Sequence, residues 1–353
     1  MPDTTLLIPG TQATSLADQD GNVVYNAVRV SLGLQKDDLG GRPPEEWQAL
    51  LSMEHAPDSW EPGRTSRLPG VEIRPASVVG TPYDRMLAFS DPWPYDWRAD
   101  IRHNGRLLLE HLRENKPSDG RWNLVGHSQG GLVIVAASAL TSSLEEFGTL
   151  VARAVLVGAP LAGTMRATEA LLWGSEDLGE AHVAAARGMA RTWPALYQML
   201  PSWNAVVDAD GRESAAGQQL IQPEGWPGSW GEGIQADHLR RTRELQGMLH
   251  GPFSRMAGVS TLAVLGNRQL TPVTVTRTGD DLPADRTSMA RQKGDTLVPY
   301  KRTLEWGGRP YADRVLAFSG KVERHAMLCA DEDVIDATRR FLAQPAPPPL
   351  STP

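Results

Sequence analysis

The chain has 353 residues, enough for one large domain or two of ordinary size. Hydrophobic residues make up 41% of it and charged residues 22%, a composition typical of a globular protein with a sizeable core. The formal net charge of −7, spread over well-mixed acidic and basic residues, argues against a nucleic-acid-binding protein, because such proteins carry a basic stripe for phosphates.

Two further features limit the class of protein. Cys329 is the one cysteine of the chain, so an intrachain disulfide and a cysteine-based metal site are both excluded, and we interpret it as a small packed residue. The apolar start, residues 4–9, is too short for a targeting segment. The longest apolar run, residues 132–140, is shorter than the about 18 residues that a membrane span needs. We therefore expect a cytoplasmic protein without a membrane span.

The first part of the chain contains few regular elements. Residues 4–8 have the pattern of a buried strand, which Pro9-Gly10 ends. Residues 17–76 are rich in loop signals, with a short strand predicted at 22–25 after the Asp20-Gly21 turn. Residues 86–89 are apolar and predict another buried strand.

From residue 98 onwards, short buried strands alternate with helices. The predicted helices are residues 98–112, 130–140 and 331–342, and the predicted strands are residues 123–125, 152–157, 259–265 and 314–318. This alternation is typical of a mostly parallel sheet covered by helices on both faces, so we predict an α/β fold.

Residues 161–258 break the alternation. They contain helical pieces, glycine-rich loops and five tryptophans: Trp173, Trp193, Trp203, Trp226 and Trp230. We interpret this segment as a lid or cap inserted into a core formed by residues 1–160 and 259–344, with a disordered proline-rich tail at 345–353. The tryptophans indicate a largely apolar pocket, with ordinary core packing as the alternative.

The strongest motif is the pentapeptide G-x-S-x-G at residues 126–130, centred on Ser128. An apolar strand pattern precedes it and a buried helix pattern follows it. A strand, a sharp turn and a helix in this order make a nucleophile elbow, whose strained turn needs small neighbours. The motif therefore predicts an α/β-hydrolase in which Ser128 is the nucleophile. The side chain of His127 should point away from it.

A serine nucleophile needs a base, and in this fold the chain order is serine, acid, histidine. After Ser128 the histidines are His182, His238, His250 and His325. The first three lie in the predicted lid, where a surface or packing role is expected. His325 alone follows the last predicted strand after a short loop, so we predict that it is the base.

The acid that orients the base is predicted to be Asp295. It stands just before the apolar pair Leu297-Val298, so it can be partly buried and hold an imidazole. Its rivals are Asp280, Asp281, Asp285 and Asp313, of which the first two lie in a polar turn.

The oxyanion hole of such an enzyme has two backbone donors. We expect one to be the N–H of Gln129, the residue after the nucleophile. The other should come from the loop after the first strand, where we predict the N–H of Thr11, with Gln12 as the alternative.

Together these segments resemble the lecithin:cholesterol acyltransferase-like family of α/β-hydrolases, which includes lysosomal phospholipases. The resemblance rests on the segments P-G-T-Q-A-T-S-L at 9–16, P-Y-D-W-R at 94–98, G-H-S-Q-G-G at 126–131, G-A-P at 158–160 followed by Gly163, W-P-A-L-Y at 193–197, L-P at 200–201 and G-D-T-L-V-P at 294–299. Asp295 precedes His325 by 30 residues, which suits the family. Ala13, Thr14, Thr296 and Leu297 depart from its usual loops, and the segment between Tyr83 and Trp97 is short for it.

The resemblance implies hydrolysis of lipid-like acyl esters through Ser128, His325 and Asp295, without a metal or organic cofactor. Acyl transfer to an alcohol acceptor is the first alternative, and a non-catalytic binding protein on the same fold is the second. The resemblance also implies that Asp96 and Arg98 pair or cap near the site. Contact of the lid with a membrane is conceivable, but the sequence has no cationic amphipathic helix that would support it.

Overall fold

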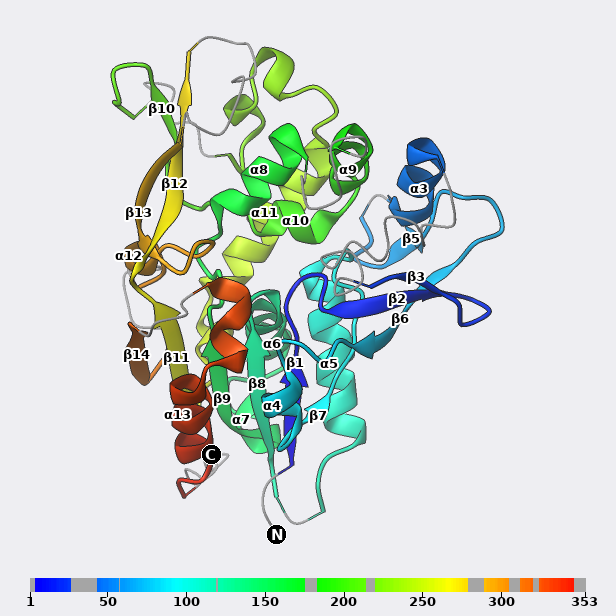
Figure 1. Ribbon diagram of the computed structural model, residues 1–353. Coiled ribbons are helices and arrows are strands. Elements are labelled where there is room, and N and C mark those ends of the chain that lie inside the picture. The colour runs from blue at the N-terminus through cyan, green and yellow to red at the C-terminus, as the bar shows by residue number, and fades with distance from the viewer. Residues whose placement is uncertain are drawn as a thin grey trace.

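The computed structural model of the protein describes residues 4–26, 43–56, 58–118, 120–174, 183–213, 220–278, 289–304, 312–319 and 324–345. Of the predicted tail, all residues after 345 lie outside the described part of the chain. The described residues build a parallel sheet with a layer of helices on each of its faces. A third layer of helices and strands lies above the carboxyl ends of the sheet strands (Figure 1).

The main sheet has six strands in the order β14-β11-β9-β8-β1-β7, and each neighbouring pair is parallel. Their bounds are β1 Thr5–Ile8, β7 Asp91–Pro92, β8 Trp122–His127, β9 Val151–Val157, β11 Ser260–Gly266 and β14 Arg314–Phe318. The chain starts in the interior at β1, adds β7 on one side, and then adds the remaining strands in order on the other. Every residue of β1, β8 and β9 is buried, as expected for parallel strands covered on both faces. The predicted α/β-hydrolase fold class is confirmed.

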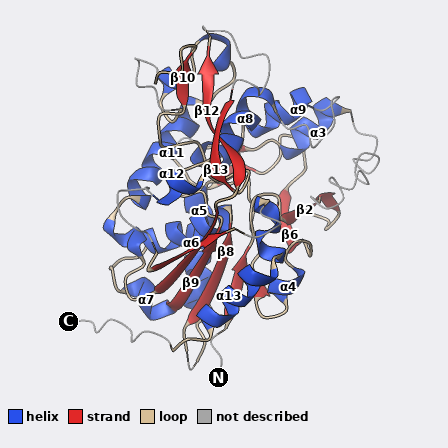
Figure 2. Cartoon of the chain, turned by 60° about the vertical axis from the view of Figure 1, so that its left-hand side comes forward, coloured by secondary structure: helices blue, strands red, loops and turns tan. Residues whose placement is uncertain are grey.

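Successive strand residues point into two different helix layers. Leu6 and Ile8 belong to a hydrophobic cluster with α5 and α6, whereas Leu7 between them belongs to a second cluster with α4 and α13. Figure 2 shows these helices on the two faces of the sheet. Their bounds are α4 Asp84–Leu87, α5 Ile101–Glu114, α6 Gln129–Ala139 and α13 Glu332–Leu342.

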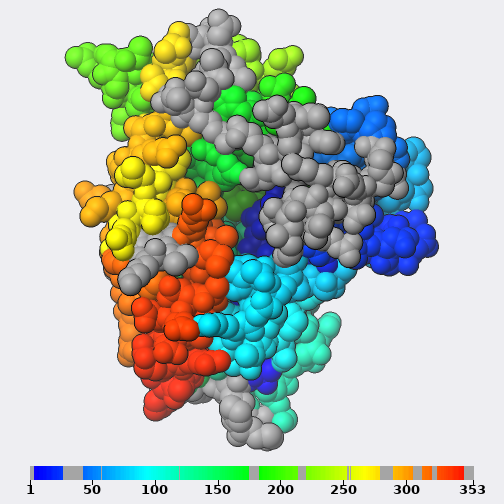
Figure 3. Space-filling view, viewed as in Figure 1, coloured from blue at the N-terminus to red at the C-terminus, as the bar shows by residue number. Residues whose placement is uncertain are grey.

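Helix α13 begins as its sequence predicts. The side chain of Asp331 accepts hydrogen bonds from the N–H groups of Asp333 and Val334, which satisfies donors that lack helical partners. An ion pair of 2.7 Å between Arg85 and Glu332 joins α13 to α4. The two segments lie side by side as red and cyan surfaces in Figure 3.

The third layer lies above the carboxyl ends of the strands. It contains α8 Met165–Trp173, α9 Val183–Ala190, α10 Pro194–Gln198, α11 Ala236–Leu249 and a small sheet of β10 Val206–Asp208, β12 Gln269–Arg277 and β13 Met289–Gly294. Strands β12 and β13 form an antiparallel hairpin that is absent from the strands predicted from the sequence. Because β12 also pairs with β10, the hairpin joins the segment 161–258 in one layer, although it follows β11 of the core.

The early segment is also more regular than predicted. Strands β2 Thr14–Asp18, β3 Val23–Tyr25 and β6 Ile73–Val78 form a small antiparallel sheet beside α3 Pro44–Leu51 and the hairpin of β4 Glu54–His55 and β5 Pro62–Arg64. The strand predicted at 86–89 was wrong, because α4 ends there. A run of four apolar residues does not distinguish a buried strand from one turn of buried helix.

The remaining described elements are short. They are α7 Glu146–Leu150, α12 Tyr300–Leu304, and the 3₁₀ turns η3 Pro223–Gly225, η4 Gly228–Trp230, η5 Pro252–Arg255 and η8 His325–Ala330. Within the described residues, no helix has the length and apolar character to cross a membrane. In the same part of the chain, no three or more His, Cys, Asp or Glu side chains are grouped to hold a metal ion. Cys329 is fully buried, and burial raises the pKa of its thiol.

Candidate active site

The loops that leave the carboxyl ends of several strands meet at one cavity of about 700 Å³. Thr11 follows β1, Ser128 follows β8, and His325 follows β14, and all three line this cavity. In an open parallel sheet, strands added on opposite sides of the first strand leave a crevice between their outgoing loops. Strands β7 and β8 flank β1 in this way, so the topology alone places the cavity here.

Ser128 occupies the sharp turn between β8 and α6. Its backbone angles are φ 52° and ψ −125°, a conformation that residues other than glycine rarely adopt. The N–H of Ser128 donates to the carbonyl of Val157 in β9 at 2.8 Å, and the carbonyl of Ser128 accepts from the N–H of Gly131 at 3.0 Å. These bonds hold the strained turn, and the side chain of Ser128 lines the cavity at the N-terminus of a buried helix.

Two glycines allow the elbow to pack against the first strand. A Cβ atom on Gly130 would lie 2.1 Å from the carbonyl oxygen of Ile8 and 2.6 Å from that of Pro9. A Cβ atom on Gly10 would lie 3.0 Å from the Cβ of Ser128. The chain therefore needs glycine on both sides of the contact to bring Ser128 against the loop that follows β1.

His325 and Asp295 form a buried pair. The Nδ1 of His325 lies 2.8 Å from Oδ2 of Asp295, and the side chains are 6% and 1% exposed. A carboxylate only accepts, so Nδ1–H donates, and in the neutral ring Nε2 is left as an acceptor. The structure thus brings together the predicted acid and base, and His325 lines the same cavity as Ser128.

Asp295 reaches this position because the hairpin returns to the end of β11. A Cβ atom on Gly266, the last residue of β11, would lie 2.7 Å from the Cβ of Asp295. The turn after Asp295 is tight, with φ 85° at Thr296, whose N–H donates to Oγ1 of Thr271 at 2.9 Å. Oδ1 of Asp295 accepts from the N–H groups of Leu297 and Val298 at 3.0 and 2.7 Å. One carboxylate oxygen is thereby fixed by the backbone, and the other accepts from His325.

The two predicted oxyanion segments touch through their side chains. The hydroxyl of Thr11 donates to Oε1 of Gln129 at 2.8 Å, and Nε2 of Gln129 donates to the carbonyl of Trp97 at 3.0 Å. Gln12 has φ 67° in a turn closed by a bond from the N–H of Ala13 to the carbonyl of Gly10. The N–H of Gly10 already donates to the hydroxyl of Tyr83, which leaves Thr11 and Gln12 as the donors to consider in this loop.

Within the described part of the chain, the residues that line the cavity are mainly apolar and include no aspartate or glutamate. Of the five tryptophans of the predicted lid, Trp193 lines it, together with Trp97 from outside that segment. The other four do not line it. Trp203 and Trp226, for example, donate to the carbonyls of Val273 and Leu220. The tryptophan content of the lid therefore mostly reflects packing, which was the alternative interpretation.

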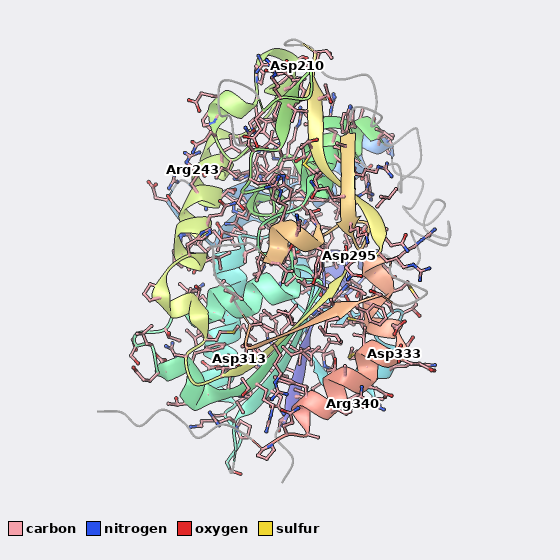
Figure 4. All side chains as sticks on the ribbon, turned by 90° about the vertical axis from the view of Figure 1, so that its left-hand side faces the viewer. Asp210, Arg243, Asp295, Asp313, Asp333 and Arg340 are labelled. Atoms are coloured by element: carbon pink, nitrogen blue, oxygen red, sulfur yellow. The ribbon has the colours of Figure 1, made fainter. Side chains whose placement is uncertain are left out.

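The competing residues that the structure describes lie elsewhere. Asp313 accepts the N–H of Thr261 at 2.8 Å where β11 begins, at the opposite end of the sheet from Asp295 (Figure 4). His238 lies in α11, and His250 directly follows that helix. Neither histidine lines the cavity. His182, Asp280, Asp281 and Asp285 lie outside the described residues.

Asp96 and Arg98 are paired, as the resemblance implied. Their side chains meet at 2.7 Å, and Arg98 is completely buried. Nη1 of Arg98 also donates to the carbonyls of Leu51 and Thr65 at 3.1 and 3.0 Å. This pair thus ties the early segment to the start of α5 and does not line the cavity.

Sequence reasoning missed the contacts of His127 and Tyr83. The Nδ1 of His127 lies 2.6 Å from the hydroxyl of Tyr83, and Nε2 lies 3.1 Å from the backbone carbonyl of His325. Burial and the nearby His325 lower the pKa of His127 to about 3. The motif could only place His127 beside the nucleophile, because Tyr83 is 44 residues away in the chain.

The fold and these residues define the class, an α/β-hydrolase with a serine elbow and a buried histidine–aspartate pair. Residues 78–228, somewhat less than half of the chain, match the family model described as lecithin:cholesterol acyltransferase. The family resemblance drawn from the sequence is thereby confirmed over this segment, which contains the P-Y-D-W-R segment and the elbow.

Three solved structures are similar to this chain at low sequence identity. A crystal structure of a Tle4–Tli4 complex has a TM-score of 0.58 and 14% identity, and the match covers 96% of this chain and 97% of that one. The mature lipase BlEst2 of Bacillus licheniformis has a TM-score of 0.42 at 13% identity, covering 97% and 92%. The product of gene lin2722 from Listeria innocua has a TM-score of 0.39 at 13% identity, covering 99% and 96%. No curated protein sequence matches the chain.

Proposed function

We propose that the protein is a serine hydrolase that cleaves lipid-like acyl esters through an acyl-enzyme on Ser128. The family match over residues 78–228 supports the broader class of acyl-ester hydrolases and acyltransferases. The observation that carries the proposal is the shared cavity. It is lined by a serine in a strained elbow and by a histidine whose Nδ1 is bound to a buried carboxylate.

The chemistry follows from the tautomer of His325. Its Nε2 takes the proton of Ser128 as the hydroxyl attacks the ester carbonyl, and Asp295 stabilises the imidazolium. The oxyanion receives N–H bonds from Gln129 and from Thr11 or Gln12, and each such donor contributes roughly 3–4 kcal/mol to the transition state. His325 then gives the proton to the leaving alcohol. Water, activated by the same base, releases the acid.

The substrate class is argued from the cavity. A volume of about 700 Å³ lined by residues such as Trp97, Trp193, Leu196 and Met199 favours a medium or long acyl chain over a polar acyl group. Among the residues that the structure describes, no aspartate or glutamate lines the cavity, so this part of the wall presents no negative charge to an acyl chain.

Acyl transfer to an alcohol is the second candidate, and the family match favours it specifically. In both reactions the acyl-enzyme is the same, and only the acceptor differs. Product analysis with a radiolabelled acyl donor, with and without added alcohols, separates the two. A new ester formed at the expense of free acid would establish transfer.

The test of the proposal is turnover of p-nitrophenyl esters of increasing acyl length. Wild type should be active and should prefer the longer chains, and Ser128→Ala should lose activity by several orders of magnitude. Ser138→Ala is the matched control, because Ser138 is a buried serine of the same helix outside the cavity lining. A fluorophosphonate should label wild type and not Ser128→Ala. A folded wild type that neither hydrolyses any ester nor accepts the label would instead establish a binding protein.

A further inference from the structure

Four residues in the wall of the cavity form a continuous line of hydrogen bonds. The N–H of Gly10 lies 2.9 Å from the hydroxyl of Tyr83, which lies 2.6 Å from Nδ1 of His127. Nε2 of His127 lies 3.1 Å from the carbonyl of His325. Tyr83 and His127 are buried, with 1% and 3% exposure. The line joins the loop after β1 to the elbow and to the predicted base.

The chemistry of the four groups fixes the direction of every bond. A carbonyl only accepts, so Nε2 of His127 carries a hydrogen and donates to His325. A neutral imidazole has one such hydrogen, so Nδ1 accepts, and the hydroxyl of Tyr83 donates to it. The same hydroxyl oxygen accepts from the N–H of Gly10. One tautomer of His127 therefore satisfies all of these groups, without a buried polar atom left over.

The line completes the support of the backbone of His325. The N–H of His325 donates to the carbonyl of Asp295 at 2.8 Å, and its carbonyl accepts from His127. The peptide groups on both sides of its Cα are therefore held in place. This fixes the position of the Cα, and with it the position of the side chain that contacts Asp295. The rings of His127 and His325 also contact, with centroids 5.0 Å apart.

We infer that Tyr83 and His127 are positioning residues that set the backbone of His325 and the oxyanion loop together, with His127 held in its neutral Nε2–H tautomer. The inference rests on the proposed function for its catalytic consequence. The hydroxyl of Tyr83 fixes Gly10, which immediately precedes the candidate donors Thr11 and Gln12, and through His127 it fixes the base. A displacement of about 1 Å at either place is enough to slow an enzyme about 100-fold.

Burial supports this assignment. Burial and the neighbouring His325 lower the pKa of His127 to about 3, so it remains neutral when His325 takes up the proton of the nucleophile. Burial likewise raises the pKa of Tyr83, so its hydroxyl keeps the hydrogen that it donates. The line thus keeps one arrangement of hydrogens throughout the reaction.

The first test is Tyr83→Phe against Tyr197→Phe. Tyr197 is a matched control, because its hydroxyl likewise donates one hydrogen bond, here to the carbonyl of Arg191, and accepts one from a backbone N–H, that of Gln235. It does not line the cavity. Tyr83→Phe should lower kcat about 10-fold to 100-fold, leave KM within about 3-fold, and shift the acid limb of the pH profile of kcat/KM. Tyr197→Phe should leave kcat and the pH profile unchanged. Equal kcat values and pH profiles for Tyr83→Phe and wild type would overturn the inference.

The second test is rescue at position 127. The amide N–H₂ of glutamine in His127→Gln can replace the donor to the carbonyl of His325, whereas His127→Leu fills the space without a donor. His127→Gln should retain at least about ten times the kcat of His127→Leu at similar thermal stability. If both variants fall equally, the hydrogen bond to His325 does not position the base.

A third measurement is independent of turnover. In protein labelled with ¹⁵N-histidine, His127 should show a protonated Nε2 and a bare Nδ1 from pH 8 down to pH 5. Tyr83→Phe should change the signals of both His127 and His325. An Nδ1–H tautomer, or a protonated His127 at pH 6, overturns the inference even if the wild type hydrolyses esters. If wild type hydrolyses no ester but shows the expected tautomer and coupled signals, the proposed function fails and the structural link stands.

Discussion

His325 and Asp295 are joined twice, by side chains and by backbone. Nδ1–H of His325 donates to Oδ2 of Asp295 at 2.8 Å, and the N–H of His325 donates to the carbonyl of Asp295 at 2.8 Å. Two short bonds between the same residues fix the imidazole in position and tautomer, although one residue follows β13 and the other follows β14. This double contact makes the pair a strong test of the proposed mechanism.

Asp295→Asn should leave the fold intact and lower kcat about 10³-fold to 10⁴-fold. The amide can donate as well as accept, so it stabilises the wrong tautomer of His325 and no longer stabilises the imidazolium. Ester hydrolysis by wild type and variant, with circular dichroism spectra of both, checks this. Asp313→Asn is the control, because Asp313 caps the other end of β11. A loss of activity in the control but not in Asp295→Asn would assign the acid to Asp313.

Thr11→Val should lower kcat about 10-fold with little change in KM. The substitution keeps the backbone N–H of Thr11 and the shape of the side chain but removes the 2.8 Å bond to Gln129. The two proposed oxyanion segments then lose their direct link. Thr11→Ser retains the hydroxyl and should be close to wild type in steady-state kinetics. Equal rates for the valine and serine variants would mean that this link does not align the donors.

Trp193→Ala should change the preference for acyl length, because Trp193 lines the cavity. The space it leaves should raise kcat/KM for the longest chains relative to the shortest. Trp226→Ala is the matched control, because both tryptophans are buried. The indole N–H of Trp193 donates to the carbonyl of Leu51, and that of Trp226 donates to the carbonyl of Leu220. Trp226→Ala should lower stability without changing the ratio of kcat/KM between long-chain and short-chain p-nitrophenyl esters. A changed ratio in both variants would place the acyl chain differently.

Gly130→Ala should destabilise the protein by roughly 1–3 kcal/mol or more, because the new Cβ would lie 2.1 Å from the carbonyl oxygen of Ile8. Gly247→Ala is the control. Gly247 lies inside α11, and outside the helix backbone no heavy atom lies within 4 Å of the position that an alanine Cβ would take. Alanine there should stabilise the helix by roughly 0.5–1 kcal/mol. Urea unfolding measures both. A stable Gly130→Ala would show that the elbow can move away from β1.

Two buried histidines and one partly buried histidine predict a loss of stability at mildly acidic pH. Burial lowers the pKa of His55 to about 4 and those of His127 and His238 to about 3, from an ordinary value of 6.5. Below pH 6.5 the unfolded chain binds protons that the folded chain does not. The free energy of unfolding therefore falls as the pH drops from 6.5 towards 4, by at most about 1.4 kcal/mol per pH unit for each histidine.

This dependence is best measured between pH 6.5 and 5, where most carboxylates remain ionised. Urea unfolding of wild type should show the slope, and the double variant His55→Gln with His238→Gln should reduce it. The rings of these two histidines contact each other, with centroids 5.5 Å apart, so they are replaced together. An unchanged slope in the double variant would contradict the assignment.

The sequence alone determined the features that depend on neighbouring residues. Uninterrupted apolar runs marked the strands of a parallel sheet, because such strands are buried on both faces. The nucleophile elbow could be predicted because its strand, turn and helix follow one another within one short segment. His325 and Asp295 could be chosen because the order of strands and motifs along the chain limits which residues follow the ends of the sheet.

Only the tertiary structure decided the features that depend on partners far apart in the chain. Strand β12 pairs with β10, more than 60 residues earlier, so its place in the third layer depends on a partner that is distant in the sequence. Tyr83 meets His127 across 44 residues, and His127 meets His325 across 198. The four lid tryptophans outside the cavity have no sequence signal that separates packing from pocket. Hydrogen bonds and packing act through space, so the sequence named the proposed catalytic residues, and the fold determined what holds them in place.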